Sequence, residues 1–364
     1  MKINRISLYQ MNVPIEPFKI SGGRVMEVFD ETIVRIETDA GIEGWGDSVP
    51  WGSNFVAAFA KGVRAGIAEL APHLIGRDPR MISQINEIMD REMVGQAYVK
   101  SAIDVACWDI LGHVTNQPVY MLLGGKLTPD LHIYGSLPPD LGPVLDERLT
   151  DLRSKGFKRF SSKSTGDVAT DIAYLRYLGE QFEPDESLKY DANAGWQVQE
   201  ALRIIAKMGE IDVLFEQPCA SYEDCRTVRL TTGKPLIFDE SATDIGVILR
   251  AHGDGILDGL NLKLAKVGGL SKMRVIRDVC AALNVPMEIQ DSSWSELACA
   301  AIAHMAHSTP SRVMMSTFGP IGMKLTKVDN PVIVGDRFMK APDLPGLGTR
   351  PKREMLGEPI AVFE

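Results

Sequence analysis

The sequence predicts an α/β protein built around an eight-unit (β/α)8 barrel of the TIM type. From about residue 131, strand-like and helix-like segments alternate with short connections between them. The strand candidates lie near 131–135, 159–163, 187–192, 212–216, 235–239, 257–263, 286–290 and 312–316. Eight such units in succession favour a closed barrel over an open sheet. In a closed barrel the carboxyl ends of all strands meet at one mouth, where barrel enzymes place their chemistry.

The residues before this alternation follow a different pattern. Apolar alternation predicts a strand beginning at Ile3 and further strands over 32–37 and 42–46. Two loops are predicted beside these strands, at 14–24 and 49–55. This part of the chain therefore starts as a small sheet rather than as a βα unit.

Helical periodicity then runs from about 54 to 114 and ends before Asn116-Gln117-Pro118. The pair Gly124-Gly125 marks a boundary. Within the alternating region, helices are predicted at 171–180, 199–208, 270–283 and 295–307. No clear long helix follows Phe318-Gly319-Pro320, and residues 321–364 are rich in proline and glycine.

The composition is that of a soluble globular protein, with 45% hydrophobic and 24% charged residues among 364. A formal net charge of −9 argues against nucleic acid or an anionic membrane as a partner. The N-terminus lacks the apolar core of a signal peptide, and no stretch approaches the roughly 18 apolar residues of a membrane span. Five scattered cysteines without a CxxC pair favour reduced thiols. We therefore expect a cytoplasmic protein.

Five polar residues recur at the rhythm of the βα units. Asp191, Glu216 and Asp239 end three successive predicted strands, and Lys163 and Lys263 end the predicted strands on either side, with gaps of 23 to 28 residues. Three carboxylates at adjacent strand ends predict a site for a hard cation. Oxygen ligands without histidine or cysteine favour Mg²⁺ over Zn²⁺, with Mn²⁺ as an alternative. A lysine on each flank could move protons to or from a substrate held there.

Each of these residues also has an ordinary interpretation. A single carboxylate at these positions could be a loop residue or a helix cap, and Lys163 alone could be a surface lysine. Lys263 lies between apolar neighbours inside a strand, so we expect a buried amine whose pKa is lowered and which can act as a base. Lys266, beside the Gly268-Gly269 turn, is expected to be structural or on the surface.

Several motifs resemble the muconate-lactonising (mandelate racemase/muconate lactonizing enzyme) subgroup of the enolase superfamily, and the resemblance covers essentially the whole chain. They are Ala102-Ile103-Asp104-Val105-Ala106-Cys107-Trp108-Asp109, Pro118-Val119-Tyr120-Met121-Leu122-Leu123-Gly124-Gly125, Asp191-Ala192-Asn193, Glu216-Gln217-Pro218, Asp239-Glu240-Ser241, Asn261-Leu262-Lys263 and Pro345-Gly346-Leu347-Gly348.

The resemblance implies an α+β capping domain over a modified barrel. The expected divisions are a capping domain at 1–125, the barrel with the active site at 126–320, and a C-terminal segment at 321–364 that returns to the capping domain. It also implies Mg²⁺ on the three carboxylates, acid/base roles for both lysines, and a homo-oligomer. The substrate would be a small carboxylate that binds the metal, and a lysine would remove its α-proton to give a metal-stabilised enediolate.

Several reactions can follow such a proton transfer. Racemisation or epimerisation of a proline-type amino acid or betaine is the first interpretation. Dehydration of a hydroxyproline or another hydroxy acid, and muconate-type cycloisomerisation, are alternatives that use the same residues. A catalytically idle barrel that binds a ligand is an interpretation of a different class.

One departure from the usual sequence of the subgroup indicates a particular branch of it. Ser161-Ser162-Lys163 replaces the frequent Lys-x-Lys, and Ser164-Thr165-Gly166 follows in place of an apolar residue and glycine. A polar residue at this position resembles the branch that holds proline-betaine and hydroxyproline epimerases and dehydratases. No histidine occurs from Met287 to Trp294, which argues against a mandelate-racemase-type histidine base.

In that branch aromatic side chains surround a cationic ring nitrogen. The matching residues are Phe55 and Phe318, with Trp51 and Trp294 nearby, although these rings could equally pack the capping domain against the barrel. Asn193 shares the strand face of Asp191 and is predicted to face the mouth. Asp291 could pair with a substrate ammonium or cap the helix that starts near Ser295. The predicted substrate-binding residues are Phe55, Asn193, Asp291, Trp294 and Phe318.

Overall fold

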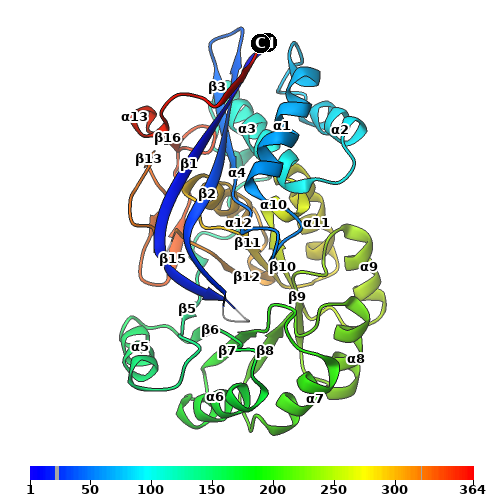
Figure 1. The fold of residues 1–364 in the computed structure, drawn as a ribbon, viewed down its shortest axis with the longest axis vertical. Helices are drawn as coiled ribbons and strands as arrows, with labels where there is room; N and C mark the ends of the chain where they lie inside the picture. The colour runs from blue at the N-terminus through cyan, green and yellow to red at the C-terminus, as the bar shows by residue number, and fades with distance from the viewer. Residues whose placement is uncertain (21–23, 321) are drawn as a thin grey trace.

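The computed structural model describes residues 1–20, 24–320 and 322–364. Two bodies are stacked along its long axis (Figure 1). The upper body holds an antiparallel sheet in the order β17-β1-β2-β3, and the lower body holds eight parallel strands in the order β12-β11-β10-β9-β8-β7-β6-β5. The predicted TIM-type barrel with an α+β capping domain is confirmed as the fold class.

The capping sheet is dominated by one long hairpin, which runs down to the mouth of the barrel in Figure 1. Its strands are β1 (Ile3–Ile20) and β2 (Arg24–Thr38), joined by β3 (Glu43–Ser48) and β17 (Ala361–Phe363). The loop predicted at 14–24 is therefore wrong up to residue 20, and residues 21–23 lie outside the described part of the chain. The two strands stay paired past a register shift between Pro14 and Phe18. A bulge of this kind accommodates prolines that cannot donate to the ladder.

The helices of the capping body pack behind this sheet. They are α1 (Ala60–Leu74), α2 (Ile82–Glu92), α3 (Ala97–Thr115) and α4 (Val119–Leu122). Helix α3 touches β3 at two glycines, because a Cβ built on Gly44 or Gly46 would lie 2.3 Å or 2.1 Å from a backbone oxygen of α3. The predicted helical stretch begins at Ala60 rather than at 54, and residues 49–59 form a loop.

The barrel strands match their predicted positions closely. The eight strands of the ring are β5 (Gly135–Ser136), β6 (Arg159–Lys163), β7 (Ser187–Asp191), β8 (Val213–Glu216), β9 (Leu236–Phe238), β10 (Gly259–Lys263), β11 (Met287–Gln290) and β12 (Met314–Thr317). The strand predicted near 131–135 is split, because β4 (Leu131–His132) pairs with β15 (Phe338–Lys340) in a separate sheet and the ring begins only at β5. A parallel bridge between Ile133 and Thr317 joins the two ends of the strand series and closes the ring. Three strands separate β6 from β10, so these two strands face each other across the barrel.

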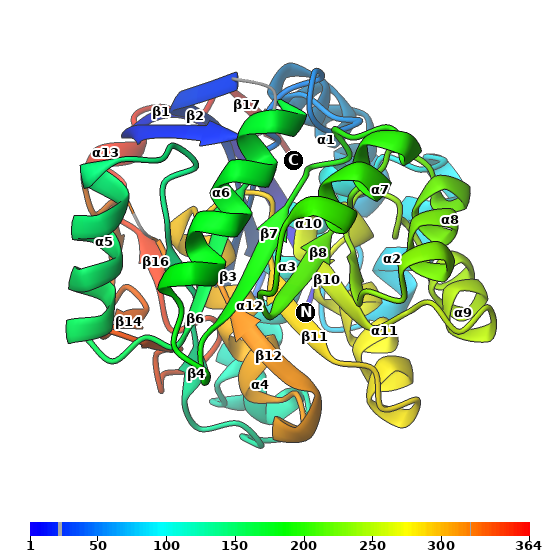
Figure 2. The ribbon, with the colours of Figure 1, turned by 90° about the horizontal axis from the view of Figure 1, so that it is seen from below.

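Helices surround the curled strands, as seen from below in Figure 2. They are α5 (Pro143–Ser154), α6 (Val168–Gln181), α7 (Val198–Lys207), α8 (Tyr222–Thr232), α9 (Ile245–Gly253), α10 (Leu264–Val267), α11 (Leu270–Ala282) and α12 (Glu296–His307), with a 3₁₀ turn at Ser311–Val313. The four helices predicted in this region are confirmed.

The C-terminal segment leaves the barrel after β12 and returns to the capping sheet. Its elements are β13 (Val328–Asp329), β14 (Ile333–Val334), β15 (Phe338–Lys340), β16 (Arg350–Pro351), α13 (Arg353–Leu356) and β17. Phe363 on β17 pairs with Ile6 on β1. The divisions at residues 125 and 320 stay a prediction.

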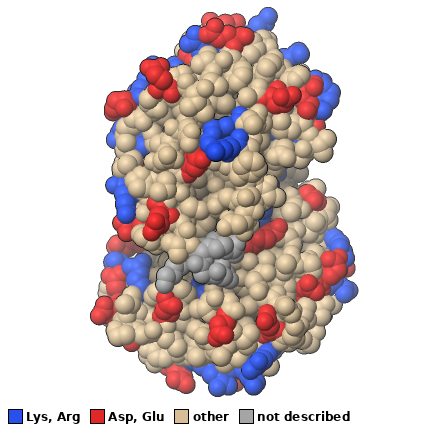
Figure 3. Space-filling view, viewed as in Figure 1, with Lys and Arg blue, Asp and Glu red and all other residues tan. Residues whose placement is uncertain are grey.

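The surface carries acidic and basic side chains intermixed on the face shown in Figure 3. Among residues 1–20, 24–320 and 322–364, no helix is both long and apolar enough to cross a membrane.

Helix α12 carries a buried histidine that is held in its neutral form. The Nδ1 atom of His304 accepts a hydrogen bond from the backbone N–H of Tyr120 at 3.3 Å, and its Nε2 atom lies 3.0 Å from the carbonyl oxygen of Leu347. These partners place the ring proton on Nε2. Burial lowers the pKa of His304 from 6.5 to about 4.

We predict that this histidine makes the protein less stable in mild acid. Between about pH 6.5 and pH 4 the unfolded chain takes up a proton on His304 that the folded chain does not, so the free energy of unfolding falls as the pH falls. The full loss from this group is about 3 kcal/mol. Urea unfolding at about pH 7 and about pH 5 should show a smaller difference for His304→Gln than for the wild type.

The matched control is His252→Gln, because His252 lies exposed on α9. This variant should keep the wild-type pH dependence. An unchanged pH dependence in His304→Gln would contradict the prediction.

Candidate active site

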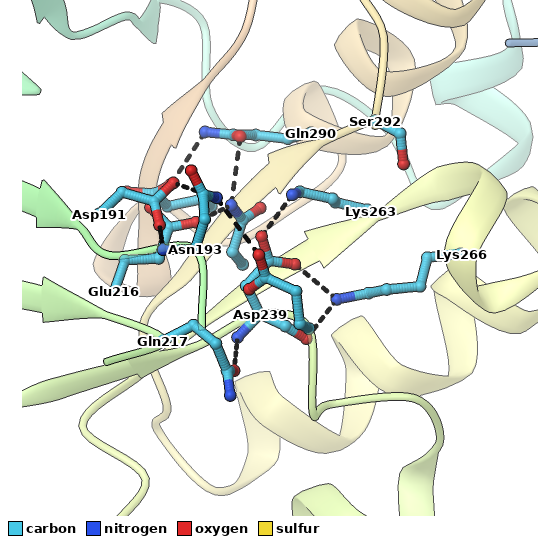
Figure 4. A network of polar contacts seen from close by, with 12 residues as sticks. Asp191, Asn193, Glu216, Gln217, Asp239, Lys263, Lys266, Gln290 and Ser292 are labelled. Carbon is cyan, nitrogen blue, oxygen red and sulfur yellow. Dashed lines mark hydrogen bonds and ion pairs between the residues drawn. The ribbon is translucent and has the colours of Figure 1, made fainter. Parts of the chain in front are cut away.

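Three of the five predicted residues are direct neighbours at the barrel mouth. Lys163 on β6 is opposite Asp191 on β7, and Asp191 is opposite Glu216 on β8. Asp239 directly follows β9, and Lys263 is the last residue of β10. The three carboxylates are at most 2% exposed. The side chains converge in Figure 4, as the strand alternation predicts.

Each of the three carboxylates lies against a lysine. Lys163 contacts Asp191, and Lys263 contacts Asp239. Lys266 Nζ also lies 2.7 Å from Asp239 Oδ1, the carboxylate oxygen that Lys263 does not contact (Figure 4). The expectation of a surface position for Lys266 is therefore wrong, since the side chain folds back from α10 onto the end of β9.

The acid–base character of Lys263 differs from the prediction. Burial alone would lower the pKa of Lys263, but Asp239, Glu240 and Glu216 outweigh burial and raise it well above the usual range. The prediction of a lowered pKa rested on burial near other cations, and it left out this concentration of negative charge, which raises the pKa when no cation is bound. For the same reason Asp239 has a strongly lowered pKa, since Lys263 and Lys266 outweigh its burial.

Asn193 joins two parts of the acidic cluster. Its backbone N–H donates to Asp191 Oδ1 at 2.8 Å, and its side-chain amide donates to Asp191 Oδ2 at 3.0 Å and to Glu240 Oε1 at 3.2 Å. The residue is left-handed with φ of 46°, a conformation that asparagine tolerates. Burial and the charge of Asp239 raise the pKa of Glu240 to about 8.

The donor set fits a hard divalent cation. Within the described residues, no three carboxylate, histidine or cysteine side chains converge closely enough to hold one ion as they stand, because the carboxylates are turned onto lysines. Buried oxygens in the same place nevertheless lack a hydrogen-bond donor among the described residues, namely Asn193 Oδ1, Glu240 Oε2 and Asn261 Oδ1. Converging oxygens of this kind are the ligands that Mg²⁺ prefers.

Gln217 fixes the spacing of two of the three carboxylates. Its side-chain carbonyl accepts hydrogen bonds from the backbone N–H groups of Asp239 at 3.0 Å and Ser241 at 3.2 Å, and from the Ser241 hydroxyl. Its amide donates to the carbonyl oxygen of Cys219 at 2.8 Å. The backbone at Gln217 has φ of 36°, which is unusual for a residue with a Cβ. These hydrogen bonds stabilise that conformation and tie the end of β8 to the end of β9 (Figure 4).

The residues that depart from the subgroup after Lys163 form a polar network. Asp171 on α6 is fully buried and accepts hydrogen bonds from the hydroxyl of Ser164 at 2.6 Å and from the hydroxyl and N–H of Thr165. Tyr190 and Trp196 donate to the same carboxylate. Five neutral donors satisfy this buried charge, so the loop after Lys163 is held against β7.

A cavity of about 600 Å³ opens above the cluster. Eight of the ten predicted site residues line it: Phe55, Lys163, Asp191, Glu216, Lys263, Asp291, Trp294 and Phe318. Asn193 and Asp239 lie directly behind this wall, bonded to Asp191 and Lys263. The structure therefore brings all ten predicted residues together, while their roles stay a prediction.

The aromatic residues pack on one another and also line the cavity. The ring of Trp294 lies 5.5 Å from Trp51 and from Phe318, and 4.9 Å from Phe18, measured between ring centroids. Trp51 in turn contacts Phe55 at 5.6 Å. Both sequence interpretations of these rings, packing and pocket lining, therefore describe the same cluster.

The alternative role of Asp291 as the cap of α12 is wrong. Ser295 is the N-cap of that helix and accepts a hydrogen bond from the N–H of Ala298. Asp291 instead accepts from the N–H of Ala265, at 2.8 Å, just after Lys263. Burial raises the pKa of Asp291 to about 6.

Sequence reasoning missed several residues of the site. Lys189 and Asn261 each stand two residues before a predicted site residue, so strand alternation could have placed both on the inner face. Phe18 was assigned to a loop. Gln217 follows Glu216, and only its left-handed backbone reveals its role.

Comparisons with known proteins agree with this geometry. The model of the mandelate racemase / muconate lactonizing enzyme N-terminal domain matches residues 4–124, and the enolase C-terminal domain-like model matches 145–355. The chain belongs to the mandelate racemase/muconate lactonizing enzyme family of the enolase superfamily. The resemblance noted from the sequence is confirmed.

Curated relatives of this chain are enzymes. The cis-3-hydroxy-L-proline dehydratase of Roseibium aggregatum is 39% identical over 100% of both chains. The N-succinyl-L-Arg/Lys racemase of Bacillus cereus is 28% identical over 100% of this chain and 99% of its own. A solved enolase-superfamily member from Roseovarius nubinhibens, complexed with magnesium, has a TM-score of 0.93 and 32% identity, and covers 100% of this chain and 99% of its own. Members of the superfamily thus bind magnesium, and the prediction of an enzyme is confirmed.

We predict that Gln217→Ala destabilises the protein and disturbs the carboxylates together. The substitution leaves two backbone N–H groups without their acceptor, each at about 1–3 kcal/mol, so the free energy of unfolding should fall by about 2–4 kcal/mol. Urea unfolding measures the loss. Gln181→Ala, at the exposed end of α6, is the control and should change stability by less than about 0.5 kcal/mol. Equal losses of stability in the two variants would contradict the prediction that Gln217 holds the ends of β8 and β9 together.

Proposed function

We propose that the protein dehydrates cis-3-hydroxy-L-proline or a closely related cyclic amino acid, starting with removal of the proton α to the carboxylate. The observation that carries this proposal is the placement of Lys163 and Lys263. They end two strands that face each other across the ring, on either side of the carboxylate cluster. The full-length relative at 39% identity supports the choice of substrate.

The stereochemistry of the substrate matches lysines on opposite sides. In a cis-3-hydroxyproline the carboxylate on C2 and the hydroxyl on C3 share one face of the ring, so the C2 proton and the hydroxyl lie on opposite faces. One lysine removes the C2 proton, and its electron pair forms the C2=C3 bond as the C3–O bond breaks. The opposite lysine gives a proton to the departing hydroxyl, which leaves as water. The remaining enamine then tautomerises to a cyclic imine.

Epimerisation of a proline-type amino acid or betaine is the second candidate. It needs the same two lysines, with the opposite lysine returning a proton to C2 instead of to a hydroxyl. Epimerisation was the first interpretation of the sequence, and the dehydratase relative moves it to second place. Cycloisomerisation shares the same machinery but has no specific observation in its favour here.

Asp191, Glu216 and Asp239 are proposed to hold Mg²⁺, with Mn²⁺ as an alternative ion. When bound, such a cation would supply positive charge that offsets these carboxylates beside Lys263 and the charge that develops on the substrate carboxylate. Asn193 then orients Asp191 and Glu240 through its three hydrogen bonds.

The ring of the substrate is proposed to lie against Phe55, Trp294 and Phe318. A protonated ring nitrogen gains about 0.5–2 kcal/mol from each aromatic face it contacts. Asp291, which lines the same cavity, is proposed to face that nitrogen.

Three further expectations belong to this proposal. The five cysteines are all buried and unpaired in the described structure, which supports a reducing cytoplasm. A homo-oligomer and the domain divisions at residues 125 and 320 also belong to it. The N-terminal and C-terminal family models end and begin on either side of the first division.

We predict that cis-3-hydroxy-L-proline, incubated with the protein and Mg²⁺ in D₂O, loses its C2 and C3 proton signals in proton NMR and yields an imine. Lys163→Ala and Lys263→Ala should each slow this dehydration by about 10²–10⁴-fold, because each removes a proton donor or acceptor. Lys158→Ala, on an exposed ion pair, is the matched control and should keep the wild-type rate.

The same spectra separate the two candidates. Exchange of the α-proton of proline or its betaine, with the opposite enantiomer formed and no imine from the hydroxylated substrate, would favour epimerisation. No α-proton loss from any cyclic amino acid, with the metal bound, would reject both.

A further inference from the structure

A second layer of buried charge lies inside the barrel beneath the carboxylates. Lys189 on β7 stands two residues before Asp191, so its side chain points to the same inner face one step deeper. Its Nζ atom lies 2.7 Å from Glu216 Oε2 and 2.6 Å from Glu288 Oε2. Lys189 is 5% exposed and Glu288 on β11 is fully buried.

These groups are linked into a closed ring that spans four strands. Gln290 donates to Glu288 at 2.8 Å, and Asn261 on β10 donates to Gln290 at 3.3 Å and to Glu216 at 2.6 Å. The ring is therefore Glu216, Lys189, Glu288, Gln290 and Asn261, returning to Glu216. We call it the charge ring; its members Glu216 and Gln290 are labelled in Figure 4.

Lys189 lies between two carboxylates at nearly equal distance, 2.6 Å from Glu288 Oε2 and 2.7 Å from Glu216 Oε2. One ammonium is thus shared by two buried carboxylates, and Glu288 supplies the second negative charge. Glu216 is held by Asn261 through Oε1 and by the ammonium of Lys189 through Oε2.

This arrangement solves an electrostatic problem. A lysine paired with Glu216 alone would cancel the charge that a cation needs, and its ammonium would repel a divalent ion a few ångströms away. With Glu288 as a permanent partner, the lysine is neutralised from below and still restrains Glu216. The charge ring thus orients Glu216 and leaves its negative charge available to a cation.

We propose that the Lys189–Glu288 pair is a positioning device that sets the affinity of Glu216 for a divalent cation. This inference rests on the proposed function, because it takes Glu216 as a cation ligand. Neither Lys189 nor Glu288 touches the substrate in this proposal; both act through Glu216.

The test is a double-mutant cycle read out by metal binding. Free Mn²⁺ is measured by electron paramagnetic resonance during titration of the protein, with Mg²⁺ as competitor. Glu288→Gln leaves the ammonium unbalanced and should weaken Mn²⁺ binding about 10-fold or more. Adding Lys189→Met to Glu288→Gln removes that ammonium and should recover most of the lost affinity. Lys189→Arg, which keeps the charge, should stay close to the wild type.

Two further variants serve as a control and as a substitute. Glu183→Gln makes the same change in the exposed pair with Lys158 and should leave Mn²⁺ binding unchanged. If Glu288→Gln fails to fold, Gln290→Leu removes the amide that orients Glu288 and the acceptor of the weaker bond from Asn261, and it should weaken binding by about 3-fold.

The outcomes separate the two proposals. A wild type that binds Mn²⁺ while the folded ring variants bind equally well overturns the inference and leaves the proposed function standing. A double variant as weak as Glu288→Gln also overturns it, since a purely structural role predicts no recovery. A wild type that binds neither ion overturns both. Recovery in the double variant supports the ring even where the hydroxyproline substrate fails.

Discussion

Crowding of negative charge at the barrel mouth is the constraint on which the rest of this structure depends. Asp191, Glu216 and Asp239 are buried close together, with Glu240 partly buried beside them. Two like charges 4 Å apart repel by about 4 kcal/mol at an effective dielectric of 20. Such a cluster persists only if positive charge is held beside it. Lysines from β6, β7, β10 and α10 supply that charge in this structure.

The architecture explains how so many charges can be held in place. Parallel strands in register set Lys163, Asp191 and Glu216 side by side, and no loop could position them as tightly. Gln217 then ties the next strand end to this row through backbone hydrogen bonds, at the cost of a left-handed residue. The Asp171 network restrains the loop after Lys163 in the same way. These buried hydrogen bonds therefore hold the acidic cluster and the loop beside it in place.

Sequence reasoning could reach the barrel and the five residues from Lys163 to Lys263 because both depend on periodicity, whereas it reached the aromatic residues through the family resemblance. Strands of fixed length separated by helices bring Lys163 through Lys263 to one mouth, whatever the details of packing. It could not reach the raised pKa of Lys263, since that depends on the sum of several charges in space. It also misread residues 14–20, because Pro14 and Pro17 signal a loop unless a register shift lets a long hairpin continue. The role of Gln217 depends on a backbone angle that no sequence pattern records.

The two lysines of the site stand in unequal surroundings, and this inequality bears on the reaction. Lys263 shares Asp239 with Lys266 and is 13% exposed at the side chain, whereas Lys163 contacts Asp191 and is 25% exposed. The carboxylates around Lys263 raise its pKa and favour its charged form as long as no cation offsets them. A racemase needs both amines to exchange the roles of acid and base with each direction of turnover. A dehydratase needs each amine in one role only, one to take the C2 proton and the other to protonate the leaving hydroxyl. Two amines in unequal surroundings therefore fit elimination more readily than racemisation.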